Sequence, residues 1–144
     1  MTSLIINTDG GSRGNPGPAA VGIVIKDETG KLVHQIGEYL GSTTNNVAEY
    51  TAVLLALKWL LSYKSTLNSS PIAVNFFLDS LLVVSQLNGR YKIKNVPLQN
   101  LHSQIKALEK ALNLPVKYHH IPREQNSQAD EIVNNTLDKA SDFH

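Results

Sequence analysis

An apolar run near the start of the chain ends in a carboxylate and leads directly into a loop rich in glycine and proline. The run begins at Leu4, the carboxylate is Asp9, and the loop extends to Pro18. An apolar run bounded by glycines is typical of a buried strand. Burying a carboxylate at the end of such a strand is costly unless a positive charge, such as a metal ion, lies beside it. Other carboxylates converging on Asp9 would therefore indicate a metal site.

The composition is typical of a soluble globular protein with one core. Of the 144 residues, 42% are hydrophobic and 17% are charged. There is no cysteine, which excludes disulfides and thiolate metal sites and suits a reducing cytosol. The first residues form no signal peptide, and the longest helical apolar stretch is too short to span a membrane. We therefore expect a cytoplasmic protein without membrane contact, and we further expect a monomer. The net charge of +1 requires any nucleic-acid-binding surface to be local.

Local patterns predict nine elements in the order β-β-β-α-β-α-α-β-α. The expected strands are 4–9, 20–26, 31–40, 72–78 and 115–119, and the expected helices are 47–63, 81–87, 97–112 and 127–140. Asn46 and Ser80 are the expected N-caps of the first two helices. A three-stranded meander followed by strands joined through helices predicts an α/β fold with a five-stranded mixed sheet and helices on both faces. We expect one domain over residues 1–140 and a frayed tail over 141–144.

Four acidic residues occupy positions from which a single sheet edge could gather them. Asp9 and Asp79 each end a predicted buried strand, and parallel strands would place both at the carboxyl edge, where open α/β sheets carry their sites. Glu49 and Asp130 fall in the first turns of predicted helices and flank the apolar faces. The neighbour of Asp130, Glu131, falls on the solvent face, so helical spacing selects Asp130.

Each acid also has a purely structural interpretation. Asn46 with Glu49 and Ser127 with Asp130 resemble capping boxes, and an aspartate before glycine is a common turn former. Four converging carboxylates, however, could not all ionise without cations. Oxygen ligands suit Mg²⁺ or Mn²⁺, and a pair of such ions is a usual device for displacement at phosphorus.

Other motifs are less specific. The glycine loop is neither a P-loop nor a dinucleotide fingerprint, because no lysine follows the glycines and strands rather than a helix come next. Hydroxyls and amides at 43–46 are suited to contact phosphate and base edges, or to serve only as loop and cap residues. Arg90, Lys92 and Lys94 alternate around Tyr91, as in a phosphate-contacting patch or a solvated loop.

Four sequence blocks together resemble type 1 ribonuclease H. The first runs from Thr8 through Asp9-Gly10-Gly11-Ser12-Arg13-Gly14-Asn15-Pro16-Gly17-Pro18 to Ala19; the others are Thr44-Asn45-Asn46 with Glu49, Leu78-Asp79-Ser80, and Ala129-Asp130-Glu131. The resemblance covers nearly the whole chain, and the first block is highly specific. The inferred order of elements agrees with the family fold.

The resemblance implies an endonuclease that cuts the RNA strand of RNA–DNA hybrids by two-metal-ion catalysis and leaves 5′-phosphate and 3′-hydroxyl ends. It implies two Mg²⁺ ions, replaceable by Mn²⁺, held by Asp9, Glu49, Asp79 and Asp130. In the family, residues matching Asn15, Asn45 and Asn46 contact the minor groove, where 2′-hydroxyls are sensed, and the match to Thr44 helps to hold a DNA phosphate. The other expected substrate-binding residues are Gly10, Gly11, Ser80, Arg90, Lys92 and Lys94.

Three departures from the family pattern point to a compact subgroup found in archaea and various bacteria. Only residues 89–96 separate the second predicted helix from the third, so the long basic protrusion of many members is absent. Many members carry a mobile histidine between the last strand and the last helix, but no histidine occurs at 121–126 here, which leaves Arg123 or Glu124 as substitutes in proton transfer or product release. Leu81 replaces a polar groove-contacting residue. Some members of this subgroup also act on double-stranded RNA, which is therefore a further expected substrate.

Three alternatives stay open at this point. One is another nuclease of the same superfamily fold, such as a junction resolvase or a transposase-like nuclease. A second is a hybrid-binding module that has lost catalysis, against which the presence of all four acids argues. A third is an aspartyl-phosphate phosphohydrolase with Asp9 as nucleophile, but its second acid would be expected at position 11, where the chain has glycine.

Overall fold

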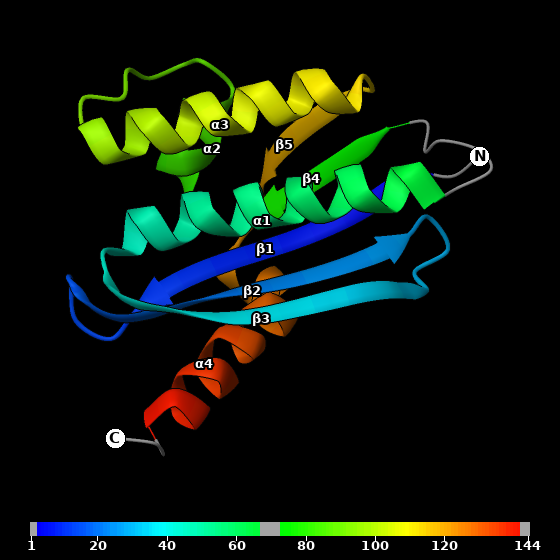
Figure 1. Cartoon of the computed structure of the whole chain (residues 1–144). Coiled ribbons are helices and arrows are strands. Elements are labelled where there is room, and N and C mark those ends of the chain that lie inside the picture. The colour runs from blue at the N-terminus through cyan, green and yellow to red at the C-terminus, as the bar shows by residue number, and fades with distance from the viewer. Residues whose placement is uncertain (1–2, 67–72, 142–144) are drawn as a thin grey trace.

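The computed structural model describes residues 3–66 and 73–141 and contains one five-stranded sheet in the order β3-β2-β1-β4-β5 (Figure 1). The strands are β1 (Leu4–Ser12), β2 (Gly17–Asp27), β3 (Leu32–Thr43), β4 (Val74–Leu78) and β5 (Val116–His120). The helices are α1 (Asn45–Thr66), α2 (Leu81–Leu87), α3 (Val96–Leu112) and α4 (Ser127–Ser141), with a 3-10 turn, η1 (Arg123–Asn126), before α4. The predicted α/β fold and order of elements are confirmed, with η1 as an addition.

The sheet is mixed, as predicted. β1 pairs antiparallel with β2, and β2 antiparallel with β3, whereas β4 runs parallel to both β1 and β5. Because β1 and β4 are parallel neighbours, their carboxyl ends lie at the same edge of the sheet. This edge is where Asp9 and Asp79 are found.

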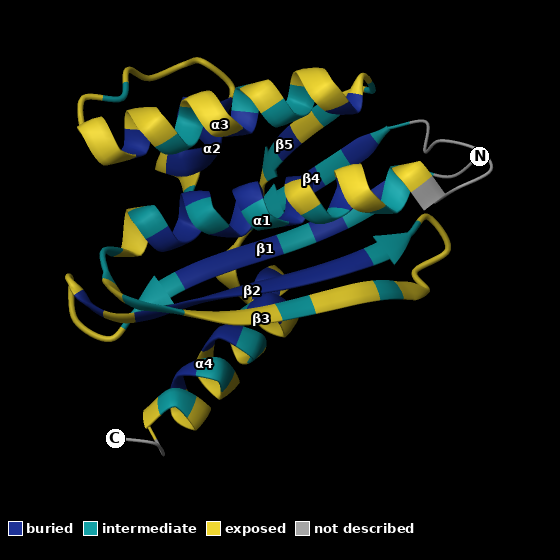
Figure 2. Ribbon diagram, in the orientation of Figure 1, coloured by how far each residue is buried: buried dark blue, intermediate teal, exposed yellow. Residues whose placement is uncertain are grey.

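Helices cover both faces of the sheet. α1 packs on β1 and carries α3 on its other side, whereas α4 crosses β2 on the opposite face (Figure 1). The core between the sheet and α1 is apolar, with Ile6, Tyr50 and Phe76 fully buried. Because α1 lies between the sheet and α3, its middle is buried on more than one side (Figure 2). Leu61, near the end of this helix, is exposed.

Several element boundaries differ from the prediction because pairing extends the strands. β1 continues past Asp9 to Ser12, since β2 pairs with it as far as Ala19, so much of the expected glycine loop is strand. β3 likewise continues to Thr43. The hydroxyl of Thr44 accepts a hydrogen bond from Val47 N at 3.3 Å, so Thr44 and not Asn46 caps α1.

Two glycines allow a helix to close on each face of the sheet beside Asp9. A Cβ on Gly10 would lie 2.3 Å from the backbone carbonyl of Ala48 at the start of α1. A Cβ on Gly22, the β2 partner of Asp9, would lie 2.1 Å from the carbonyl oxygen of Ala129 in α4. Both separations are far below van der Waals contact. Glycine at these two positions therefore brings the first turns of α1 and α4 close to the end of β1.

Two sequence predictions concern residues at the limits of the described chain. Ser141, the first residue of the expected tail, is the last residue of α4, and the rest of that tail lies outside the described residues. The expected start of the fourth strand at residue 72 also lies outside them. Among the described residues, no helix is long and apolar enough to cross a bilayer.

Candidate active site

The four acids predicted from the sequence lie around the carboxyl edge of β1 and β4. Asp9 is in β1, Asp79 follows β4 directly, and Asp130 is in the first turn of α4. Glu49 belongs to the second turn of α1, because this helix begins two residues earlier than expected. All four line one cavity of about 400 Å³. Glu131 is exposed, as predicted.

Three of these carboxylates are close enough to share a cation. One oxygen from each of Asp9, Glu49 and Asp79 lies within 4.8 Å of the other two. Asp130 is near enough to Asp9 to contribute to raising the pKa of that side chain. The structure thus brings together carboxylates from β1, from the end of β4 and from two helices.

The side chain of Glu49 is directed across to β1 and does not form a capping box. It is only 7% exposed, and its Oε1 accepts a hydrogen bond from Gly10 N at 3.1 Å. Its other oxygen, Oε2, is buried without a hydrogen-bond partner among the described residues. A buried carboxylate oxygen left unpaired in this way is costly. The atom therefore fits a ligand that the protein itself does not provide.

The electrostatics of the cluster favour a positive charge or bound protons. The pKa of Asp9 is raised to about 7, chiefly by burial; the contact with Glu49 lowers it, and the Asp79 and Asp130 carboxylates contribute to raising it. Burial, followed by repulsion from Asp9, holds the pKa of Glu49 well above its usual range. Divalent cations with a preference for oxygen ligands would relieve both the repulsion and the unpaired oxygen. The residues present therefore fit Mg²⁺ or Mn²⁺.

Asn126, which the sequence analysis did not single out, contacts the cluster from η1. It is 1% exposed and donates through Nδ2 to Thr8 O at 2.9 Å and to Asp79 Oδ2 at 3.2 Å. Its Oδ1 accepts a hydrogen bond from Asn7 Nδ2 at 3.1 Å. A lone asparagine just before a helix has the appearance of a cap in a sequence, so only its burial reveals this contact.

The predicted groove-contacting amides form a connected rim beside the acids. Asn45 and Asn46 line the cavity together with Gly10, Gly11 and Ser80. Asn15 lies outside it, and its Oδ1 accepts a hydrogen bond from Asn45 N at 3.0 Å. Asn45 Oδ1 in turn accepts from Ser12 N at 2.8 Å. These contacts use the amide oxygens, and within the described part of the chain no hydrogen bond occupies the side-chain nitrogen of Asn15 or Asn45.

The predicted basic residues lie apart from the cavity. Arg90, Lys92 and Lys94 are exposed in the connection between α2 and α3, and none of them lines the acidic cavity. The backbone of this connection is held by Gln99, which donates to Ile93 O at 2.7 Å. Leu81, adjacent to Ser80, is 58% exposed.

Two arginines line the acidic cavity. Arg123 was predicted from the sequence as one of two candidates, and the other, Glu124, is exposed and does not line the cavity. Arg13 was missed by the sequence analysis, and its guanidinium forms an ion pair with Asp138 of α4 at 2.7 Å. This ion pair ties the loop after β1 to the helix that carries Asp130.

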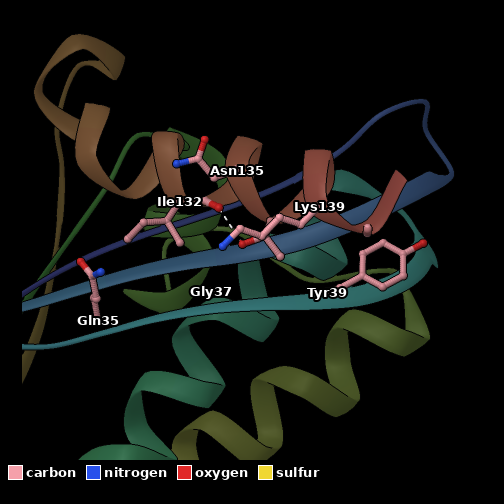
Figure 3. A pocket seen from close by; sticks show the side chains of 8 residues that line it. Gln35, Gly37, Tyr39, Ile132, Asn135 and Lys139 are labelled. Carbon is pink, nitrogen blue, oxygen red and sulfur yellow. Dashed lines mark hydrogen bonds between the residues drawn. The ribbon is translucent and has the colours of Figure 1, made fainter. Parts of the chain in front are cut away.

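A larger hollow lies elsewhere and holds none of the acids. It has a volume of about 580 Å³ and lies between β3 and α4 (Figure 3). Its lining includes Gln35, Tyr39, Ile132 and Lys139. Size alone would therefore select the wrong region, whereas the convergent carboxylates identify the candidate active site.

Comparison with known proteins agrees with this geometry. A model of the reverse transcriptase-like family matches residues 7–136. The chain is 36% identical over 139 residues to the bifunctional protein Rv2228c of Mycobacterium tuberculosis, covering 96% of this chain and 36% of that protein. It is 35% identical over 132 residues to ribonuclease HI of Halobacterium salinarum, covering 92% of this chain and 63% of that protein. The chain thus spans only about a third of the first of these relatives.

The fold is also shared with solved structures. LC11-RNase H1, isolated from compost by a metagenomic approach, superimposes with a TM-score of 0.90 at 44% identity and covers 97% of this chain and 99% of its own. The same enzyme in complex with an RNA/DNA hybrid gives a TM-score of 0.89. Fold and family model together place the chain in the reverse transcriptase-like class. Within that class, it belongs to the type 1 ribonuclease H family, as the sequence motifs predicted.

Proposed function

We propose that this chain hydrolyses the RNA strand of RNA–DNA hybrids with the help of two divalent cations. Water adds to the scissile phosphorus, the bond from phosphorus to the 3′-oxygen breaks, and that oxygen takes up a proton. The products carry a 5′-phosphate and a 3′-hydroxyl. The observation that carries the proposal is the buried, unpaired oxygen of Glu49 within a cluster of three convergent carboxylates.

Asp9, Glu49, Asp79 and Asp130 are the residues that would hold the cations. When bound, such cations supply Lewis-acid polarisation of the phosphate and lower the pKa of water. The protein contributes a fixed arrangement of ligands, because Gly10 N–H holds one oxygen of Glu49 and Asn126 holds one oxygen of Asp79. Mg²⁺ is the proposed physiological ion and Mn²⁺ its substitute, as the oxygen-only donor set suggests.

The rim of the cavity supports recognition of a hybrid. The side-chain nitrogens of Asn15 and Asn45, together with Asn46, are suited to donate to groove acceptors, and 2′-hydroxyls there distinguish RNA from DNA. Thr44 accepts its capping bond through oxygen and keeps its hydroxyl proton for a DNA phosphate. Gly10, Gly11 and Ser80 border the scissile region. LC11-RNase H1, which shares this fold, has a structure in complex with an RNA/DNA hybrid.

Basic side chains complete the proposed substrate contacts. Arg90, Lys92 and Lys94 contact phosphates beyond the cavity and compensate in part for the missing basic protrusion. Arg123 takes over the position of the family's mobile histidine, because it lines the acidic cavity while Glu124 does not. A guanidinium does not release its proton. Arg123 therefore acts on the charge of the phosphate or on product release and not as a proton carrier.

The remaining proposals concern scope and setting. Double-stranded RNA is proposed as a second substrate, in keeping with the compact connection between α2 and α3. We further propose that residues 1–140 form one catalytic domain, and that the chain acts as a monomer in the cytoplasm. The absence of cysteine from the sequence supports a reducing location.

The proposal is tested with end-labelled substrates. RNA–DNA hybrid, double-stranded RNA, single-stranded RNA and double-stranded DNA are incubated with the protein in Mg²⁺, Mn²⁺ or EDTA. We expect metal-dependent cleavage of the RNA strand of the hybrid, with 5′-phosphate products. Cleavage of double-stranded RNA would support the wider substrate range. A folded protein that binds hybrid but cuts nothing in either metal would instead support a binding module that has lost catalysis.

A further inference from the structure

A pair of asparagines, the half-buried Asn7 and the buried Asn126, extends from β1 to the carboxylate of Asp79. The parallel pairing of β1 with β4 extends to Asn7 opposite Phe77. Past this pair, the carbonyl of Leu78 accepts a hydrogen bond from Ile121 N at 2.9 Å, which continues the pairing of β4 with β5 into the segment after β5. Asn126 occupies the position between the two diverging strand ends.

The orientation of the Asn126 amide is determined by its neighbours. Thr8 O can only accept a hydrogen bond, so the group 2.9 Å from it must be the NH₂ of Asn126. The same nitrogen then donates its second proton to Asp79 Oδ2, and the amide oxygen faces the donor Nδ2 of Asn7. All three contacts agree, and a flipped amide would lose all three.

The hydrogen bond from Asn126 restricts the orientation of the Asp79 carboxylate. A carboxylate that accepts a hydrogen bond at one oxygen has fewer orientations, and its other oxygen is presented to the shared cation site. Without Asn7, the Asn126 amide would keep its contacts with Thr8 O and Asp79, but its oxygen would lose the donor that faces it. Asn7 therefore strengthens the orientation of the amide that holds Asp79, without contacting Asp79 itself.

We propose that Asn126 is a positioning residue for the cation ligand Asp79, and that Asn7 supports the amide orientation on which this depends. The inference rests on the proposed function, because it assigns a role toward the divalent cations. It adds two residues that the motif pattern of the sequence did not select. Asn7 in particular lies within a strand that otherwise looks like an ordinary core strand.

Calorimetric titration with Mn²⁺ in the absence of nucleic acid tests the proposal. We expect Asn126→Ala to weaken Mn²⁺ binding about 10- to 100-fold, as loss of an outer-sphere partner does, and Asn7→Ala to weaken it less. Asn75→Ala is the matched control: Asn75 is a half-buried asparagine in β4 whose Oδ1 contacts His119 Nε2 at 2.9 Å, and it does not line the acidic cavity. It should bind Mn²⁺ like the wild type.

Kinetics separate positioning from a general structural effect. For Asn126→Ala, kcat at low Mg²⁺ should fall while KM for the hybrid stays constant, and added Mg²⁺ should recover kcat. Should this variant fail to fold, Asn126→Ser and Asn7→Ala provide the same test. If the folded Asn126 and Asn7 variants bind Mn²⁺ as tightly as Asn75→Ala does, the positioning role is overturned. A wild-type protein that binds Mn²⁺ but cleaves no hybrid would overturn the proposed function alone.

Discussion

Asp9 lies directly opposite Gly22 in the antiparallel pairing of β1 with β2, so the site is built around a carboxylate beside a position without a side chain. The missing Cβ of Gly22 admits the backbone of α4 at Ala129, one residue before Asp130. On the other face, Gly10 admits α1 at Ala48, one residue before Glu49. These two close contacts between helix and sheet therefore bring Glu49 and Asp130 near Asp9.

Gly10→Ala should destabilise the protein, because the new Cβ would meet the backbone of α1. We expect a loss of at least about 2 kcal/mol in the free energy of unfolding, as for severe overpacking. Gly11→Ala is the matched control, since its Cβ would lie 3.6 Å from Val133 Cγ1, an ordinary contact. Urea denaturation measures both. Equal stability of the two variants would show that α1 does not approach β1 as closely as described.

The metal-free protein should lose stability as the pH rises from about 4 to about 7. The pKa of Asp9 is raised from 3.8 to about 7 in the folded state, so in this window the folded state binds more protons than the unfolded state. Each such proton lowers the free energy of unfolding by about 1.4 kcal/mol per pH unit. Glu49, with its pKa also raised, acts in the same direction.

Urea denaturation in EDTA across this range, for wild type and Asp9→Asn, isolates the contribution of Asp9. The free energy of unfolding of the variant should decline less steeply with rising pH than that of the wild type. Mg²⁺ should stabilise the wild type most at the higher pH, where the acids are ionised. Parallel curves for the two proteins would contradict the raised pKa of Asp9.

Much of this site followed from local patterns, and the parts that did not depend on tertiary contacts. Asp9 and Asp79 were predicted because each ends an apolar run, and Asp130 was preferred over Glu131 because helical spacing separates them. The extension of β1 through Gly10 and Gly11 was missed, because glycines resemble a loop until pairing with β2 is known. Asn126 was missed because its partners lie on segments remote in sequence.

Arg123 should influence rate without influencing the pH dependence of the reaction. Arg123→Ala removes a charge that lines the acidic cavity, and we expect kcat to fall about 10-fold or more. The midpoints of the pH–rate profile should stay where they are, because a guanidinium does not titrate. Glu124→Ala, outside the cavity, should leave kcat near that of the wild type. A shifted profile in Arg123→Ala would instead indicate a part in proton transfer.

The basic connection between α2 and α3 should contribute to the salt dependence of hybrid binding. Arg90→Ala and Lys92→Ala should each reduce the slope of log affinity against log salt by about one unit, if each contacts one phosphate. Lys139→Ala, at the hollow between β3 and α4, serves as the control and should leave the slope unchanged. Binding is measured by anisotropy in Ca²⁺ or EDTA to prevent cleavage. An unchanged slope in both test variants would show that other residues contact the phosphates.

The most direct test compares Asp79→Asn with Glu131→Gln in single-turnover cleavage of an end-labelled RNA–DNA hybrid in Mg²⁺. Both substitutions convert an acid to its amide, but only Asp79 belongs to the cluster of convergent carboxylates, whereas Glu131 is exposed. Circular dichroism establishes that both variants fold. The account predicts that Asp79→Asn abolishes cleavage and that Glu131→Gln cuts like the wild type. A folded Asp79→Asn variant that cleaves at the wild-type rate would contradict the assignment of the cation site.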